Sequence, residues 1–106
     1  MELMNQIRQE LENAERAQSE GKAGLSRVCA RRAAGLAVRE YLSGHGYESQ
    51  SGNNFELMLH PAPRALLPSS IHIALDHLTM SVDLNHNLPA EINLIDDAKF
   101  VIGELS

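Results

Sequence analysis

Residues 27–42 read RVCARRAAGLAVREYL, a stretch in which small apolar residues are mixed with four arginines. At about 100° per residue, four alanines and Tyr41 fall within one arc of roughly 100° on a helix. We call these alanines the alanine ridge: Ala30, Ala33, Ala34 and Ala37. Other apolar residues occupy much of the remaining circumference, as in a central helix with several neighbours. The stretch therefore predicts a helix over about residues 25–42, whose ridge contacts either another helix of the chain or a second copy.

The arginines of this stretch lie in two separate pairs. Arg27 and Arg31 are one helical turn apart, whereas Arg32 and Arg39 are two turns apart on another side, with Gly35 leaving a notch near them. Because the two pairs lie on different sides of the helix, they do not form one continuous surface for binding a nucleic-acid backbone. We interpret the arginines mainly as solvated or ion-paired side chains whose stems cover apolar surface, and an anion site as the alternative.

Bulk properties favour one ordinary globular domain over residues 1–106, with one core. The formal net charge of -5 disfavours non-specific DNA binding, because the whole-chain field repels phosphates. Aromatic residues make up 4% of the chain and Trp is absent, which leaves little material for base stacking. A single cysteine excludes an internal disulfide, and the charged first residues resemble neither a signal peptide nor a membrane span. We therefore expect a cytoplasmic protein without membrane association.

A second helix precedes the opening stretch. Over residues 2–19, apolar side chains recur every three or four positions and form one narrow stripe, at Leu3, Met4, Ile7, Leu11, Ala14 and Ala17. Gly21 and Gly24 then interrupt the pattern, which predicts a short connection and an antiparallel helical hairpin. The stretch Ser43-Gly44-His45-Gly46 is a typical stop signal for the second arm.

Polar and proline-containing stretches divide the second half of the chain. The expected order is a loop over 47–54, a short helical segment over 55–59, a stop at 60–63, a helix over 71–80 after Pro68, a loop over 82–89, and a last helix capped by Asn93. Each longer helix has one apolar side, formed by Ile71, Ala74, Leu75 and Leu78 in the first and by Leu94, Ile95, Ala98, Val101, Ile102 and Leu105 in the last. The sequence thus predicts an all-α fold, an antiparallel up-and-down bundle of four main helices plus one short helical segment.

Two of these segments together resemble a known family. The pattern RRAAGLAVREYL, followed by a polar loop, a short apolar segment and a C-terminal NLIDDAKFVIGEL helix, resembles the HEPN family of small helical bundles. In that family the second helix typically carries an acidic residue and a lysine, where this chain has Gly35 and Arg39. The resemblance implies a homodimer, often paired with a nucleotidyltransferase partner in a toxin–antitoxin or related module. In some branches it implies a metal-independent ribonuclease.

The ribonuclease branch uses an arginine followed after four to six residues by a histidine. Such cleavage needs a proton acceptor and donor near neutrality and a fixed cation for the phosphate charge. In this sequence only Arg39 and His45 have the required spacing, so they are the catalytic candidates. The alternative is that His45, between two glycines, is an exposed position at a helix C-terminus, where a cation suits the helix dipole.

Other polar residues are candidates for ligand contacts. Arg32 is the candidate for an anion site. Asp83 and His86 lie in a polar loop whose side chains either contact a ligand or only stabilise turns and helix ends. His72 and Asp76, one turn apart, supply two metal ligands at most, and with no third ligand we predict neither a metal nor a cofactor. Cys29 lacks an activating partner and is interpreted as a small core residue.

Three functions remain after these exclusions. The first is a non-enzymatic HEPN-like accessory module, a homodimer that binds a partner protein or a nucleotide. The second is a HEPN-type ribonuclease that uses Arg39 and His45. The third is a structural bundle with no ligand, because the sequence contains no concentrated polar site that a generic bundle would lack.

Overall fold

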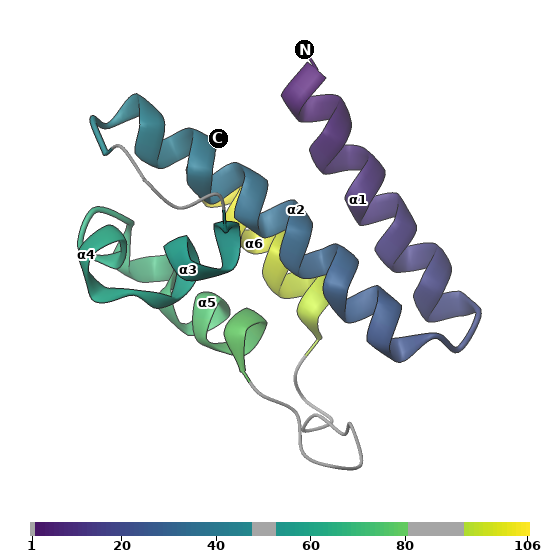
Figure 1. Cartoon of the computed structure of the whole chain (residues 1–106). Coiled ribbons are helices and arrows are strands. Elements are labelled where there is room, and N and C mark those ends of the chain that lie inside the picture. Colours follow the sequence, from purple (N-terminus) through teal and green to yellow (C-terminus); the bar gives the residue numbers. More distant parts are fainter. Residues whose placement is uncertain (1, 48–52, 81–92) are drawn as a thin grey trace.

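A computed structural model describes residues 2–47, 53–80 and 93–106, and these residues form helices without any strand (Figure 1). The elements are α1 (Glu2–Ser19), α2 (Ala23–Gly44), α3 (Asn54–Leu59), α4 (Pro61–Arg64), the 3-10 turn η1 (Ser69–Ile71), α5 (His72–Thr79) and α6 (Leu94–Leu105). The predicted all-α class is confirmed, with α1, α2, α5 and α6 as the main helices. The loop predicted over 82–89, which includes the candidates Asp83 and His86, lies outside the described residues.

The connection between α1 and α2 is shorter than the two glycines suggested. Gly21 has a φ of +77°, a backbone conformation that favours glycine, and the Lys22 backbone N–H donates to the Ala17 carbonyl oxygen at 2.8 Å. Helix α2 already begins at Ala23, so Gly24 lies inside it rather than in the connection. The predicted interruption between the two helices is present, but of Gly21 and Gly24 only Gly21 has a backbone conformation that favours glycine.

Proline residues begin helices here as well as ending them. Helix α3 ends at Leu59 because His60 is extended, with φ −74° and ψ 145°, as expected for a residue before proline. Pro61 then occupies the first turn of α4, a one-turn helix that the sequence analysis did not predict. Likewise, the 3-10 turn η1 follows Pro68, and α5 starts only at His72.

Two side-chain contacts show the relative direction of α5 and α6. Near the start of α5, Ser70 Oγ donates to Glu104 Oε1 at 2.8 Å, close to the end of α6. Near the end of α5, His77 Nδ1 lies 3.0 Å from Asp97 Oδ2 at the start of α6. The two helices are therefore antiparallel, as α1 and α2 are (Figure 1), and the predicted up-and-down order holds.

Helix α2 runs through the centre of the bundle. Helix α1 lies on one side of it and α3, α4 and α5 lie on the other, while α6 runs behind it (Figure 1). All four ridge alanines are buried within this one chain, so the ridge is core rather than an interface with a second copy. Ala30 and Ala34 join the main core, whereas Ala33 and Ala37 pack with Ile7 of α1.

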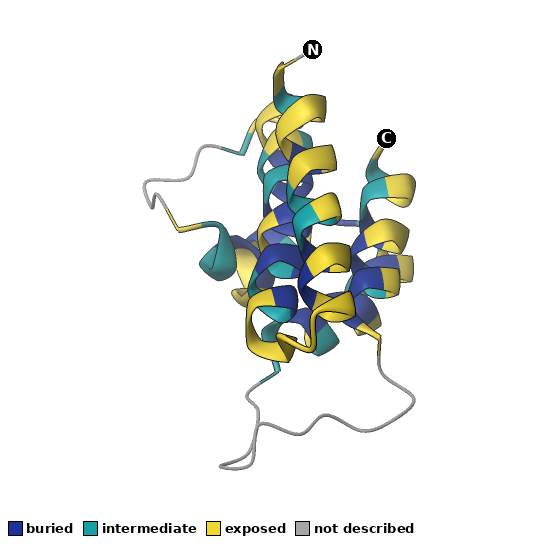
Figure 2. Ribbon diagram, turned by 90° about the vertical axis from the view of Figure 1, so that its right-hand side faces the viewer, coloured by how far each residue is buried: buried dark blue, intermediate teal, exposed yellow. Residues whose placement is uncertain are grey.

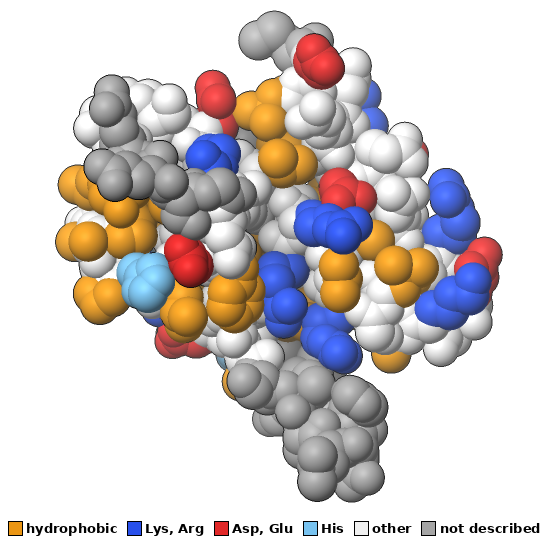
Figure 3. Space-filling view, viewed as in Figure 1, with side chains coloured by type: hydrophobic (Ala, Val, Ile, Leu, Met, Phe, Trp, Pro, Cys, Tyr) orange, Lys and Arg blue, Asp and Glu red, His pale blue; other side chains and the backbone are white. Residues whose placement is uncertain are grey.

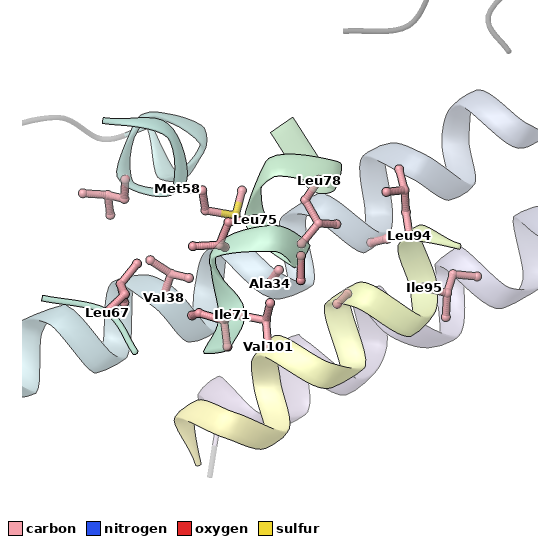
Figure 4. Packing of buried hydrophobic residues seen from close by; sticks show 14 of the residues in the cluster. Ala34, Val38, Met58, Leu67, Ile71, Leu75, Leu78, Leu94, Ile95 and Val101 are labelled. Carbon is pink, nitrogen blue, oxygen red and sulfur yellow. The ribbon is translucent and has the colours of Figure 1, made fainter. Parts of the chain in front are cut away.

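The main core fills the space between α2, α5 and α6 with aliphatic side chains. Val38 of α2, Leu75 of α5 and Val101 of α6 point toward one another and are fully buried (Figure 4). Met58 of α3 closes the same cluster from the side. Every residue of the predicted apolar side of the 71–80 helix is buried, at Ile71, Ala74, Leu75 and Leu78. The periodicity of the sequence therefore located this core correctly.

Small residues also allow α1 to lie close to α2. Ala14 and Ala17 of α1 are buried against α2, and the hydroxyl of the buried Ser26 donates to the Ala14 carbonyl oxygen at 2.9 Å. The outer face of α1 is exposed (Figure 2). No helix in the described ranges is long and apolar enough to cross a membrane.

The ridge gives a test of this packing. Ala34 is fully buried, so Ala34→Leu should overpack the core and lower the free energy of unfolding by about 1–3 kcal/mol, as measured by urea denaturation. Ala23→Leu, at the exposed first position of α2, is the matched control and should change stability little. Because the ridge is internal, light scattering should give the same mass for both variants and the parent. Parent-like stability of Ala34→Leu would contradict the packing.

Candidate functional site

The described residues form an open cleft of about 450 Å³ between α1, α2 and α3, which we call the arginine cleft. It is lined by Glu10, Val28, Arg31, Arg32, Leu36, Asn53, Asn54, Phe55 and Met58. Two arginines and one glutamate are the charged residues of this lining. The cleft is therefore locally cationic in a chain whose formal net charge is -5.

The start of α3 forms one wall of the cleft because it lies directly against α2 at Gly35. A Cβ atom at position 35 would lie only 2.8 Å from Asn54 Cβ, closer than side chains normally approach. Arg39 Nε donates to Asn54 Oδ1, and the Asn53 side chain caps α3 by accepting from the Phe55 backbone N–H at 2.9 Å. The notch predicted at Gly35 is thus occupied by α3 rather than left open.

Arg31 is a fixed cation inside the cleft. Its Nε donates to the Leu78 carbonyl oxygen at 2.6 Å, and its guanidinium lies over the Phe55 ring, 5.1 Å from the centroid. Burial, and then repulsion by Arg27, lower the pKa of Arg31 below its ordinary value. Among the described residues no carboxylate pairs with Arg31, so part of its positive charge is left for another group.

Arg32 is the exposed cation of the cleft. Its side chain is 63% exposed, and its Nη1 lies 3.8 Å from Glu10 Oε2, a loose ion pair across to α1. Lys and Arg side chains gather over the middle of this face of the molecule (Figure 3). Of the three ligand candidates of the sequence analysis, Arg32 alone lies among the described residues, and it lines the cleft.

The predicted catalytic pair is not brought together. Arg39 turns toward α3 and bonds Asn54, whereas His45 is exposed at the C-terminal end of α2. His45 stacks on the Tyr41 ring at 4.0 Å, and its Nδ1 lies 2.8 Å from the Tyr41 carbonyl oxygen. Six positions at about 100° each place the two side chains ~120° apart around the helix. They therefore face different surfaces.

The suggested metal pair is engaged with an arginine. Arg64 Nη1 lies 2.5 Å from Asp76 Oδ1, and its Nε donates to the Met58 carbonyl oxygen at 2.6 Å. His72 Nε2 lies 3.0 Å from the Arg64 carbonyl oxygen. Both residues thus hold α4 against α5. No group of three or more His, Cys, Asp or Glu residues gathers in the described part of the chain.

Cys29 is a buried free thiol at the edge of the core, as interpreted from the sequence. Burial, and then the nearby Glu10 carboxylate, raise the pKa of this thiol above its ordinary value, while Arg32 opposes the shift. At neutral pH the thiol is therefore protonated. A protonated, buried thiol is not a nucleophile.

The contact between Arg31 and Phe55 escaped the sequence analysis because it joins residues 24 positions apart in the chain. The contact between His77 and Asp97 was missed for the same reason. The available signal was weak: Phe55 follows an asparagine pair typical of a helix start, which places an aromatic ring in the first turn of a helix. Nothing in the sequence indicated which arginine that ring would meet.

No family model, curated protein or solved structure matches this chain. The HEPN resemblance therefore stays a prediction.

The contact between Gly35 and Asn54 generates a prediction in which two glycines respond oppositely. Gly35→Ala should destabilise the protein by about 1–2 kcal/mol, because the added Cβ collides with Asn54 Cβ. Gly24→Ala meets nothing within 4 Å and should stabilise α2 by up to ~1 kcal/mol through helix propensity. Thermal unfolding of the two variants measures both effects. Equal stabilisation by both would show that α3 does not lie against α2.

Proposed function

We propose that this chain is a non-enzymatic HEPN-like accessory module of the cytoplasm, a homodimer that binds a nucleotide in the arginine cleft. The observation that carries the proposal is the placement of Arg31 and Arg32 in one cleft beside the Phe55 ring. This arrangement suits a ligand that combines negative charge with a planar ring. The volume of about 450 Å³ lies within the ordinary range of small-molecule sites.

The two arginines would serve a phosphate differently. Arg31 is already positioned by Leu78 and Phe55, so little side-chain freedom is lost when it meets an anion. Arg32 is exposed and only loosely paired with Glu10, so it is able to turn from that carboxylate to a phosphate. A base would lie against the apolar side of the cleft, formed by the partly exposed Val28 and Leu36.

The protein partner in this proposal is a nucleotidyltransferase-type protein, as the HEPN resemblance implies. Binding to such a partner and to a nucleotide are compatible, because a nucleotide is a substrate of that class of enzyme. A nucleotidyltransferase gene beside the gene of this chain would support the partner. The structural alternative, a bundle with no ligand, accounts for the core but leaves the unpaired charge of Arg31 without a role.

The ribonuclease alternative is disfavoured by geometry. Its two candidates lie on different surfaces of α2, and Arg39 is bonded to Asn54. A general acid or base must reach the reacting hydroxyl directly or through one water, on the same side as the cation that holds the phosphate. Within one chain, Arg39 and His45 do not meet this condition.

Titration with ATP tests the proposed ligand class. The parent should bind ATP, and Arg32→Gln should weaken binding at least about tenfold, because a hydrogen bond between charged groups is lost. Arg8→Gln, which changes an exposed arginine of α1 outside the cleft, is the matched control and should bind like the parent. Isothermal calorimetry gives the affinities. If both variants bound ATP equally weakly, binding would depend only on net charge. If the parent did not bind ATP, the proposal of a nucleotide site would be wrong.

RNA cleavage tests the enzymatic alternative. The purified protein should leave a mixed RNA pool intact, since its catalytic candidates are separated. His45→Ala should change the free energy of unfolding by no more than about 0.5 kcal/mol, as expected at an exposed position. Gel analysis of the RNA and urea denaturation check these outcomes. Cleavage by the parent that disappears in both His45→Ala and Arg39→Ala, with both variants folded, would establish the ribonuclease instead.

A further inference from the structure

A second hollow opens at the opposite end of α2 from the α1–α2 turn, and we call it the end groove. Its volume is about 350 Å³, and it lies between the first turns of α1 and the last turns of α2 and α6. It is lined by Leu3, Met4, Ile7, Ala37, Glu40, Tyr41, Gly44, His45, Ile102, Leu105 and Ser106. None of these residues belongs to the arginine cleft.

Helix divergence and small residues keep the end groove open. Helix α1 lies nearest to α2 at their connecting turn and moves away from it toward the N-terminus (Figure 1). The α2 residues on this side include Ala37 and Gly44, which contribute almost no volume. A Cβ atom at Gly44 would meet nothing within 4 Å, so space remains at the mouth of the groove.

The walls of the end groove are apolar and only partly covered by the chain itself. Leu3, Ile102 and Leu105 are half-buried, and Met4 is 43% exposed. The ring of Tyr41 adds a half-buried aromatic surface. A ligand that covered these side chains would remove apolar area from water, which favours binding in proportion to that area.

The mouth of the end groove carries a negative charge. Glu40 is exposed there, and no lysine or arginine is among the lining residues. The imidazole of His45 has its Nδ1 2.8 Å from the Tyr41 carbonyl oxygen. Because a carbonyl oxygen only accepts, Nδ1 is the donor of this hydrogen bond. The Ser106 hydroxyl donates to the Ile102 carbonyl oxygen at 2.6 Å.

From this combination we infer that the end groove binds a small amphipathic cation, with its apolar body between α1, α2 and α6 and an ammonium group at Glu40. The carboxylate supplies charge complementarity to the ammonium group. The site does not depend on the function proposed for the arginine cleft, because the two hollows favour ligands of opposite charge.

Three probes that differ only in the head group test the inference: 4-phenylbutylamine, 4-phenylbutanol and 4-phenylbutyrate. The amine should bind about two- to fivefold more tightly than the carboxylate, the range expected for an exposed ion pair. NMR titration should move the methyl signals of Leu3, Ile7, Ile102 and Leu105, which line the groove. Glu40→Gln should remove the preference for the amine, and Glu12→Gln, an exposed glutamate outside the groove, should keep it.

A filling variant tests whether the ligand lies inside the groove. Gly44→Leu adds a side chain to the mouth without meeting a neighbour, so the protein should stay folded. The affinity for 4-phenylbutylamine should fall at least about fivefold. Gly103→Leu also has open space but lies outside the groove, and should bind like the parent. Equal affinity for amine and carboxylate would overturn the inference. So would shifts confined to other residues, or self-association that broadens the same methyl signals without any probe.

Discussion

The close approach of neighbouring helices to α2 is the constraint on which the other features depend. Alanines at 30, 33, 34 and 37 and a glycine at 35 give this helix almost no side-chain volume on several sides. Helix α1 therefore lies near enough for the Ser26 hydroxyl to reach the Ala14 carbonyl oxygen, and α3 lies near enough to exclude a Cβ at position 35. Larger residues would separate the helices and open the core.

This arrangement also explains where the charges are. A helix surrounded by neighbours has little free surface, so its arginines emerge at the borders between helices. Arg31 reaches a carbonyl of α5 and the ring of Phe55, Arg39 reaches α3, and Arg32 reaches α1. Most of these contacts hold the bundle together. The excess charge at Arg31 and Arg32 is what makes the arginine cleft suitable for an anion.

The arginine cleft and the end groove differ in origin and in chemistry. The arginine cleft lies along the flank of α2, where α3 packs against it, and is cationic. The end groove lies where α1 diverges from α2, and is apolar with a negative mouth. A bundle of short helices produces both kinds of space, because helices that are close at one point must separate at another.

The sequence by itself determined the helical class, the central position of the ridge-bearing helix and the buried sides of the 71–80 and C-terminal helices. These follow from periodicity, which reports locally which face of a helix is apolar. It also indicated the Asn93 cap, whose side chain accepts from the backbone N–H groups of Ile95 and Asp96. Tertiary structure alone decided that the ridge is internal, that Gly35 receives Asn54, and that Arg31 meets Phe55. These contacts join distant segments, and helical spacing specifies the direction of a side chain but not the partner that it meets.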